Sequence, residues 1–242
     1  MLSFSNRLSV DNNLKDDYDD YFFSTEDELE WWRLCSIDKT KNIIALCSAV
    51  AHTSILEIGC GEGAILKRLS ELRFGESLYG LEISRTGLAR ANEKSIDSLI
   101  ECKLFDGYNI PYKDKKFDLA ILTHVIEHVE HPRRLLREAG RVADFIFIEI
   151  PLEDNYRLKK NYVYDKVGHI NVYSSKTIRW LAQTCGFEVL QQKVTLSSYP
   201  VFQWQLGKKA LLAYPVLKAA LQLLPKTATR LFTYHCVMLC KM

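Results

Sequence analysis

Apolar residues along the chain gather in short runs separated by stretches of helical periodicity. The runs are rich in Ile, Leu, Val and Phe and predict strands at 54–58, 78–83, 100–105, 117–122, 145–150, 187–194 and 230–240. The stretches between them predict helices at 64–72, 86–92, 125–139 and 176–185. Strands that alternate with helices in this way are typical of parallel, doubly wound sheets. We therefore expect a Rossmann-like α/β fold on a mostly parallel sheet of seven strands.

Helical additions are predicted at both ends of this sheet. Residues 26–50 carry apolar residues at helical spacing and predict one or two helices, with Asp38 or Thr40 as the cap of the second. We expect an N-terminal helical extension over 1–52 and a main domain over 53–242 that carries a helical insertion at about 199–228.

Residues 206–224 form the most apolar stretch of the chain. Lys208, Lys209, Pro215 and Lys218 interrupt it, so it falls well short of the ~20 apolar residues that a membrane-spanning helix needs. A lid or core helix is the favoured interpretation, and a helix lying on a membrane surface is the alternative.

Composition indicates an ordinary globular protein. The chain has 242 residues, of which 48% are hydrophobic and 26% are charged. Its seven cysteines are scattered and form no CxxC pair, so neither a disulfide framework nor a zinc ribbon is indicated. The first residues have neither the apolar core of a signal peptide nor the Arg-rich bias of a transit peptide. These features favour a cytoplasmic protein.

Charge is unevenly distributed, although the formal net charge is only +2. Nine acids stand against Arg7 and Lys15 in the first 30 residues, whereas seven bases and no acid follow Glu188. Such a basic part is commonly a solvated face. The sharper interpretation is an anionic acceptor or a membrane surface close to it, so peripheral membrane contact is kept as an option.

Three glycines, Gly59, Gly61 and Gly63, occupy alternate positions where the first strand feeds a helix. Glycine there allows positive φ and a close backbone approach to a ligand, and the helix start offers free N–H groups. With Ala64 and Glu82 the segment also satisfies a dinucleotide fingerprint. The glycines alone therefore leave the cofactor open.

Two further acids bear on the cofactor, and the first of them disfavours a dinucleotide. Glu57 precedes the first glycine, where its charge would repel a pyrophosphate but attract the ammonium of a cofactor that bears an amino acid. Asp106 ends the third predicted strand, where its carboxylate can accept a hydrogen bond from an adenine amino group. Three strand ends therefore address three parts of one molecule.

From about Ser54 to Phe187 the chain resembles the class I S-adenosylmethionine-dependent methyltransferases, in particular the branch that methylates oxygen or nitrogen of small molecules and glycans. The resemblance implies S-adenosyl-L-methionine as cofactor and S-adenosyl-L-homocysteine as product. It also implies the cofactor-binding residues, which are Glu57, Gly59, Cys60 (through its backbone), Gly61 and Gly63 around the methionine moiety, Glu82 and Ile83 at the ribose, Asp106 and Gly107 at the adenine, and Thr123.

A cluster of histidines follows the fourth predicted strand. His124, Glu127, His128 and His131 stand at i, i+3, i+4 and i+7, which is one face if the segment is helical. HxxEH is also a metalloprotease signature, but here it follows a strand inside a cofactor-binding sheet, which excludes that interpretation.

Some relatives of the resembled family, the quinone-pathway and small-RNA methyltransferases, hold a divalent metal with ExxEH at this position. Here His124 replaces the first glutamate, so a site with Glu127, His128 and His169 would favour a borderline metal. Metal binding, acid–base or orienting work, and simple packing all stay open. We assign His124, Glu127, His128 and His169 to catalysis on the acceptor side and assign no metal. An imidazole with a pKa near 6.5 suits removal of the acceptor's proton.

The segments outside the resemblance are expected to define a small-molecule acceptor. Aromatic residues lie at Tyr18, Tyr21, Trp31, Trp32, 156–164 and 199–204, and basic residues include Arg157, Lys159, Lys160 and Lys166. An anionic or amphipathic acceptor, such as a sugar, polyketide or lipid-linked intermediate, fits this mixture. An RNA or tRNA methyltransferase is one alternative, although nucleic acid is disfavoured because the [DNS]PP[YF] signature is missing. A non-catalytic or dinucleotide-binding fold is the other alternative, and the oligomeric state is open.

Overall fold

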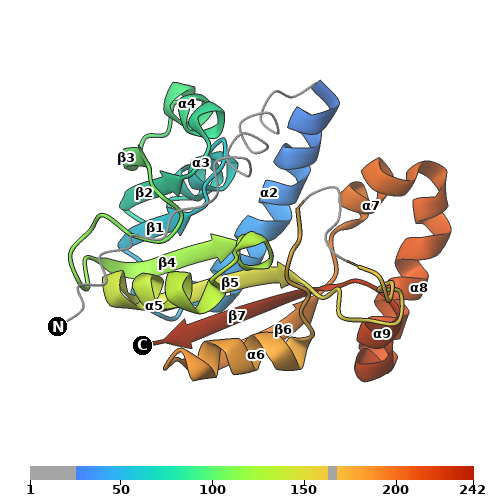
Figure 1. Cartoon of the computed structure of the whole chain (residues 1–242). Coiled ribbons are helices and arrows are strands. Elements are labelled where there is room, and N and C mark those ends of the chain that lie inside the picture. The colour runs from blue at the N-terminus through green and yellow to red at the C-terminus, as the bar shows by residue number, and fades with distance from the viewer. Residues whose placement is uncertain (1–25, 163–167) are drawn as a thin grey trace.

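The computed structural model describes residues 26–162 and 168–242, and its centre is a sheet of seven strands in the order β3-β2-β1-β4-β5-β7-β6 (Figure 1). Every neighbouring pair up to β5 is parallel, whereas β7 is antiparallel to both β5 and β6. The strands are β1 (Ser54–Ile58), β2 (Ser77–Glu82), β3 (Leu99–Leu104), β4 (Phe117–Thr123), β5 (Ala143–Pro151), β6 (Glu188–Thr195) and β7 (His235–Lys241). The expected seven-stranded, mostly parallel sheet is confirmed.

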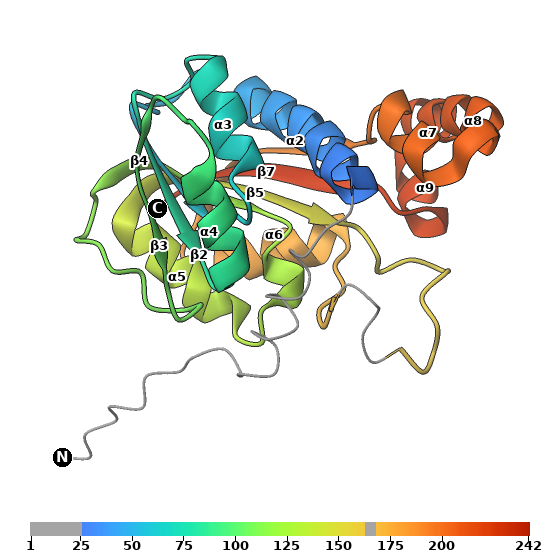
Figure 2. The ribbon, with the colours of Figure 1, turned by 90° about the horizontal axis from the view of Figure 1, so that it is seen from above.

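Helices cover both faces of the sheet. One face carries α2 (Glu26–Cys47), α3 (Ala64–Glu71) and α4 (Arg85–Glu93), and the other carries α5 (Pro132–Val142) and α6 (Ser175–Thr184) (Figure 1). A third group, α7 (Tyr199–Leu206), α8 (Ala210–Leu223) and α9 (Pro225–Leu231), lies together beyond the carboxyl ends of the parallel strands (Figures 1 and 2).

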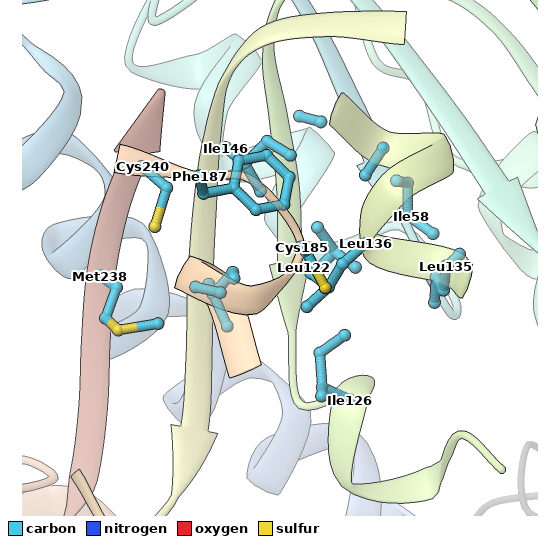
Figure 3. Packing of buried hydrophobic residues seen from close by; sticks show 14 of the residues in the cluster. Ile58, Leu122, Ile126, Leu135, Leu136, Ile146, Cys185, Phe187, Met238 and Cys240 are labelled. Atoms are coloured by element: carbon cyan, nitrogen blue, oxygen red, sulfur yellow. The ribbon is translucent and has the colours of Figure 1, made fainter. Parts of the chain in front are cut away.

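Alternating side chains of the strands build two hydrophobic cores. On β5, Ile146 and Ile148 pack towards α5 and α6, whereas Phe147 packs towards α2 and α3. Figure 3 shows the first of these cores, in which Leu135 and Leu136 of α5 meet strand residues and Phe187. Both faces are thus buried, which explains the nearly continuous apolar runs of the sequence.

The alternation becomes polar at one edge of the face that α2 and α3 cover. The apolar residues Ile55, Ile121 and Phe147 point to this face, and two residues later on the same three strands the side chains are polar, namely Glu57, Thr123 and Glu149. His235 begins β7 beside the end of β5. All three carboxyl-end residues are buried. A polar edge on an otherwise apolar face marks the place where a ligand would meet the sheet.

Two predicted elements and one predicted helix cap differ from the structure. The helix expected over 125–139 is a 3-10 turn at Ile126–His128 followed by α5, because Pro132 sets the first turn of a new helix. The strand expected over 230–240 begins only at His235, since its first residues end α9. Residues 26–47 form one helix, and Asp38 accepts a hydrogen bond from the Ser198 backbone N–H (2.6 Å) instead of capping a second helix.

The apolar stretch 206–224 forms the end of α7, a 3-10 turn at Gly207–Lys209 and α8. Within the described part of the chain, no helix combines the length and apolarity needed to cross a bilayer.

Candidate active site

A cavity of about 1600 Å³ lies over the polar edge of the sheet and extends to α7 and α8. Eight of the ten predicted cofactor residues line it, namely Glu57, Gly59, Cys60, Gly61, Glu82, Ile83, Gly107 and Thr123. The predicted acceptor-side histidines His124, His128 and His169 line it as well. The structure therefore brings both predicted groups to one cavity.

The glycine loop between β1 and α3 has a left-handed backbone conformation that residues other than glycine rarely adopt. Gly59, Gly61 and Gly63 have φ values of 74°, 53° and 79°. A Cβ on Gly59 would lie 2.7 Å from Val125 Cγ2, so a side chain there would also collide with the β4 loop. The Gly59 and Cys60 N–H groups donate to Leu81 O at 2.7 and 3.0 Å, which fixes the loop against β2.

Glu82 holds the same loop from the end of β2. One carboxylate oxygen accepts the Gly61 N–H (2.7 Å), and the other accepts the N–H groups of Ile83 and Ser84 (2.9 Å each). Glu82 is 4% exposed, so these bonds replace lost water contacts. The residue predicted to bind a ribose therefore also shapes the glycine loop.

Glu57 contrasts with Glu82. It is buried, and its Oε2 has no hydrogen-bond partner among residues 26–162 and 168–242. Burial raises the pKa of the Glu57 carboxyl well above its usual value, and the charge of Lys39 on α2 partly opposes this rise. Lys39 lines the same cavity. An acid and an ammonium thus face the space beside the glycine loop, and sequence patterning gave no signal for the lysine.

Asp106 and Gly63 lie outside the cavity lining. Asp106 Oδ1 accepts the N–H groups of Tyr108 (2.9 Å) and Asn109 (2.6 Å), and Oδ2 contacts the Asn109 amide. This carboxylate shapes the loop after β3, whereas the next residue, Gly107, reaches the cavity with a φ of 91°. Gly63 is the N-cap of α3. A role of Asp106 at the adenine stays a prediction.

The histidine segment does not form the single helical face that its spacing suggested. His131 is exposed and stands at the start of α5, where its ring lies 5.8 Å from that of Tyr108. His124 adopts a left-handed backbone with φ 55° and donates its N–H to Glu149 O (2.8 Å). The turn therefore brings His124 and His128 into the cavity lining, buries Glu127 behind them and leaves His131 out.

One polar group beside the turn after β4 combines Glu127, His128, His169 and Glu153. The His128 and His169 rings are 4.7 Å apart. His128 Nδ1 lies 3.1 Å from Gly168 O, and His169 Nδ1 lies 2.8 Å from Glu153 Oε2. The Glu127 backbone oxygen accepts the N–H groups of Ile170 and Asn171, which holds the His169 segment against the turn.

Glu127 is the most deeply buried member of this group. Its side chain is fully buried, and within the described ranges neither carboxylate oxygen has a hydrogen-bond partner, although His124 Nδ1 lies 3.1 Å from Oε1. Burial raises the pKa of Glu127, and the charge of His128 opposes the rise.

A second polar group consists of His124, Glu149 and His235. The Nε2 atom of His124 is 3.9 Å from Glu149 Oε1, and His235 Nδ1 is 3.8 Å from the same oxygen. Asn42 of α2 donates to Glu149 Oε2 (3.0 Å). Burial raises the pKa of Glu149 to about 7 and lowers that of His235 to about 3, so both favour their neutral forms.

Both polar groups have donor atoms close enough for a metal ion. The atoms of Glu127, His128 and His169 lie within 4.8 Å of one another, and so do those of His124, Glu149 and His235. In the first set both Nδ1 atoms are held by acceptors, the arrangement that orients imidazole ligands. In the second set the positive charge of Lys39 acts on all three residues and opposes a cation. The structure thus divides the metal set considered from sequence, in which His124 stood with Glu127, His128 and His169.

The far wall of the cavity is mainly apolar. Trp31 and Trp32 come from α2, Val201 and Phe202 from α7, and Ala213, Val216 and Leu217 from α8. The Trp31 ring packs 4.7 Å from that of Trp204, which joins α2 to α7. Of the predicted aromatic residues, Tyr18, Tyr21 and Tyr164 lie outside the described residues, as does Lys166, and Tyr156 is 77% exposed.

Four contributors were missed from sequence, namely Lys39, Glu149, Glu153 and His235. Glu149, at the end of a predicted strand, carried the same signal as Glu57 and could have been found by it. His235 was hidden inside a predicted strand, and Lys39 and Glu153 depend on tertiary packing alone.

The family comparison covers most of the chain. A methyltransferase domain family matches residues 24–192. Norajmaline N-methyltransferase of Rauvolfia serpentina is 31% identical over 96 residues, which are 37% of this chain and 32% of that protein. The mitochondrial ubiquinone biosynthesis O-methyltransferase of Candida albicans is 32% identical over 90 residues, which are 35% and 27% of the two chains. The chain thus spans about a third of the length of these relatives.

A solved structure shows the same fold. The geranyl diphosphate C-methyltransferase of Streptomyces coelicolor, in complex with Mg²⁺, geranyl diphosphate and S-adenosyl-L-homocysteine, superposes with a TM-score of 0.63 at 12% identity, covering 84% of this chain and 77% of that one. At this identity the likeness concerns the fold alone. Family match, strand order and glycine loop agree, and the chain belongs to the methyltransferase domain family of class I S-adenosylmethionine-dependent methyltransferases.

Proposed function

We propose that the protein transfers a methyl group from S-adenosyl-L-methionine to an oxygen or nitrogen of a small-molecule acceptor. The observation that carries the proposal is the presence of both Glu57 and Lys39 in the lining of the cavity beside the glycine loop. A buried carboxylate that lacks a hydrogen-bond partner for one oxygen in the described chain faces the same cavity as an ammonium. This pair complements the ammonium and carboxylate of an amino-acid moiety.

The remaining predicted residues fit the rest of the cofactor. Gly59, Gly61 and the Cys60 backbone would border the methionine moiety. Glu82 and Ile83 would meet the ribose, and Gly107 with Asp106 the adenine, while Thr123 lies beside Glu149 on the sheet edge. The Cys60 thiol is no nucleophile in this scheme, because its contact with Cys102 and burial raise its pKa well above the usual value. The bound cofactor supplies an activated methyl group.

His169 and His128 would receive the acceptor. Glu153, bonded to His169 Nδ1, favours the tautomer in which Nε2 accepts the proton that leaves the attacking hydroxyl or amine. Glu127 and His124, whose Oε1 and Nδ1 atoms lie 3.1 Å apart, would orient these rings from behind. We assign the group orienting and acid–base roles and no metal, so methyl transfer should survive treatment with a chelator.

The acceptor has room and an apolar wall. A single ligand pocket commonly measures about 300–1,000 Å³, so a cavity of about 1600 Å³ accommodates a cofactor together with an acceptor. Trp31, Phe202 and Leu217 offer apolar contacts, and Arg157 lines the same cavity. We propose an amphipathic acceptor with an anionic part, for which α2 and the insertion α7–α9 act as the enclosing lid. Nucleic acid is not expected in this chamber.

The cellular setting proposed from sequence is the cytoplasm, with peripheral membrane contact that would deliver such an acceptor. The expected preference is tested by methyl transfer from labelled cofactor to anionic, neutral and lipid-linked acceptor pools at low and high salt. Anionic or lipid-linked acceptors should be favoured. A preference for neutral polar acceptors without salt dependence would contradict the acceptor assignment.

The amino-acid pair is tested with two ligands. S-adenosylhomocysteine carries an amino-acid moiety, whereas 5′-methylthioadenosine lacks one. Lys39→Met should weaken the first ligand about tenfold in calorimetry and leave the second unchanged, since a charged hydrogen bond contributes roughly 1.5–3 kcal/mol. Equal weakening of both ligands, or of neither, would remove Lys39 from the proposal. Lys67→Met, an exposed lysine of α3, is the control.

A further inference from the structure

The outer side of the helices α7–α9 has the composition of a membrane-binding surface. Leu211, Leu212, Leu223 and Leu224 are 64%, 79%, 77% and 62% exposed, and within α8 only Ala210 is buried. Large apolar side chains gathered on a surface mark an interaction site. In Figures 1 and 2 these helices stand apart from the sheet, so the rest of the described chain leaves this side uncovered.

The exposed residues form a stripe on α8. At 3.6 residues per turn, Leu212, Val216 and Leu223 point within about 40° of one another. Val216 is 62% exposed and also lines the large cavity. The stripe therefore borders the mouth of the chamber, and Leu212 and Leu223 extend it along the outer surface.

All charged side chains of α7–α9 and their connections are basic. Lys208, Lys209, Lys218, Lys226 and Arg230 are exposed, and no Asp or Glu occurs after Glu188. A helix with exposed leucines flanked by lysines binds anionic bilayers by inserting its apolar side chains and attracting lipid phosphates. A surface for RNA would be basic but would not need four exposed leucines.

We propose that α8 and its flanking turns dock this protein onto an anionic lipid bilayer, with the stripe of Leu212, Val216 and Leu223 entering the lipid and the lysines contacting phosphate headgroups. The docked face places the Val216 mouth of the cavity at the bilayer. Docking goes beyond methyl transfer and does not rest on it, because the surface is defined by exposed side chains outside the cofactor site.

The test is vesicle flotation of the full chain. Vesicles of phosphatidylcholine with phosphatidylglycerol should carry the protein at low salt, and phosphatidylcholine alone should carry it poorly. Lys208→Ala with Lys209→Ala should weaken binding on the order of 10- to 30-fold, since each base contributes about fivefold near such a surface. Leu212→Ser with Leu223→Ser should weaken binding to a similar extent.

Matched controls lie far from the proposed face. Ile100→Ser on the edge strand β3 removes a side chain that is 58% exposed, and Lys67→Ala with Lys113→Ala removes two exposed charges. Both controls should bind vesicles like the unaltered protein. All variants replace exposed residues, and circular dichroism with thermal unfolding confirms that each is folded, whether or not it binds the cofactor.

Three results would overturn the proposal. The first is absence of binding to anionic vesicles. The second is binding that the leucine substitutions leave unchanged, which would reduce the contact to non-specific charge attraction. The third is a dimer in solution that Leu212→Ser with Leu223→Ser dissociates, since a second copy would then cover the face. RNA binding through the same lysines without vesicle binding would give the first result and identify a different partner.

Discussion

Two buried carboxylates near the cavity are satisfied differently. At the end of β2, Glu82 accepts three backbone N–H groups. In the turn after β4, Glu127 is fully buried behind the residues that line the cavity, and within the described chain neither of its oxygens has a hydrogen-bond partner, although His124 Nδ1 lies 3.1 Å from Oε1. A bonded carboxylate stabilises the fold, whereas an unpartnered one costs free energy until something binds it. The backbone of the described residues thus satisfies the Glu82 carboxylate and leaves the Glu127 carboxylate without hydrogen bonds.

Glu57, near the end of β1, resembles Glu127 more than its neighbour Glu82, because one of its carboxylate oxygens also lacks a hydrogen bond from the described part of the chain. It lies one strand away from Glu82, and Glu57↔Gly80 are register partners on β1 and β2. Yet its Oε2 has no hydrogen-bond partner in the residues that the structure describes. Neighbouring strand-end acids thus differ in how fully the surrounding chain satisfies their carboxylates.

The largest expected effect concerns the proposed acceptor end. His169→Ala should lower kcat about 10²- to 10⁴-fold, because it removes the proposed proton acceptor, and should leave S-adenosylhomocysteine affinity unchanged. Glu153→Gln should cause a smaller loss and move the pH profile of kcat, since Gln cannot stabilise a protonated imidazole. Steady-state kinetics with calorimetry measures both quantities. An equal loss of ligand affinity in His169→Ala would show that the residue only supports the pocket.

The second prediction concerns Glu149, a buried acid whose pKa is raised to about 7. An unfolded Glu ionises near pH 4.3, so between that pH and about 7 the folded protein binds more protons than the unfolded one. This group therefore lowers stability as pH rises through that window. Glu149→Gln should gain stability relative to the unaltered protein between pH 5 and 8, by up to ~3 kcal/mol.

Denaturant unfolding at several pH values measures this difference. His235, whose pKa is lowered to about 3, acts in the opposite sense, because the folded protein loses stability as pH falls below the usual pKa of histidine. Comparing the two proteins at each pH isolates the Glu149 contribution. A stability difference that does not change with pH would show that Glu149 stays ionised in the folded state.

The third prediction concerns Glu57. Glu57→Gln should weaken S-adenosylhomocysteine binding roughly tenfold, the value of one charged hydrogen bond. Burial raises the pKa of Glu57, so a bound ammonium should lower it again and release a proton. Calorimetry in two buffers of different ionisation enthalpy measures this proton. Release that persists in Glu57→Gln would assign the proton to another group.

Sequence patterning predicted the sheet well because both of its faces are buried, so runs such as 117–122 and 145–150 needed no tertiary information. It also found the glycine loop, since φ values between 53° and 79° exclude most other residues. It was wrong about 125–139, where helical spacing suggested that His124, Glu127, His128 and His131 share one face of a helix. Pro132 breaks that segment, and His131 leaves the site.

Residues of the site that come from distant elements were beyond prediction. Lys39 lines the same cavity as Glu57 because α2 packs against α3 and the sheet. The His169–Glu153 pair joins two ends of a long connection through a single contact of 2.8 Å. Neither arrangement leaves a periodic signal in the sequence.

The central claim is that the glycine loop and Glu57 bind S-adenosylmethionine or its product. Calorimetric titration of S-adenosylhomocysteine into Gly59→Val and Gly207→Val tests it most directly. Both glycines have positive φ, but a Cβ on Gly59 would lie 2.7 Å from Val125, whereas nothing lies within 4 Å of one on Gly207. The account predicts binding to the unaltered protein and to Gly207→Val, and a loss of about 100-fold in Gly59→Val. Unchanged affinity in Gly59→Val, or no binding to the unaltered protein, would contradict it.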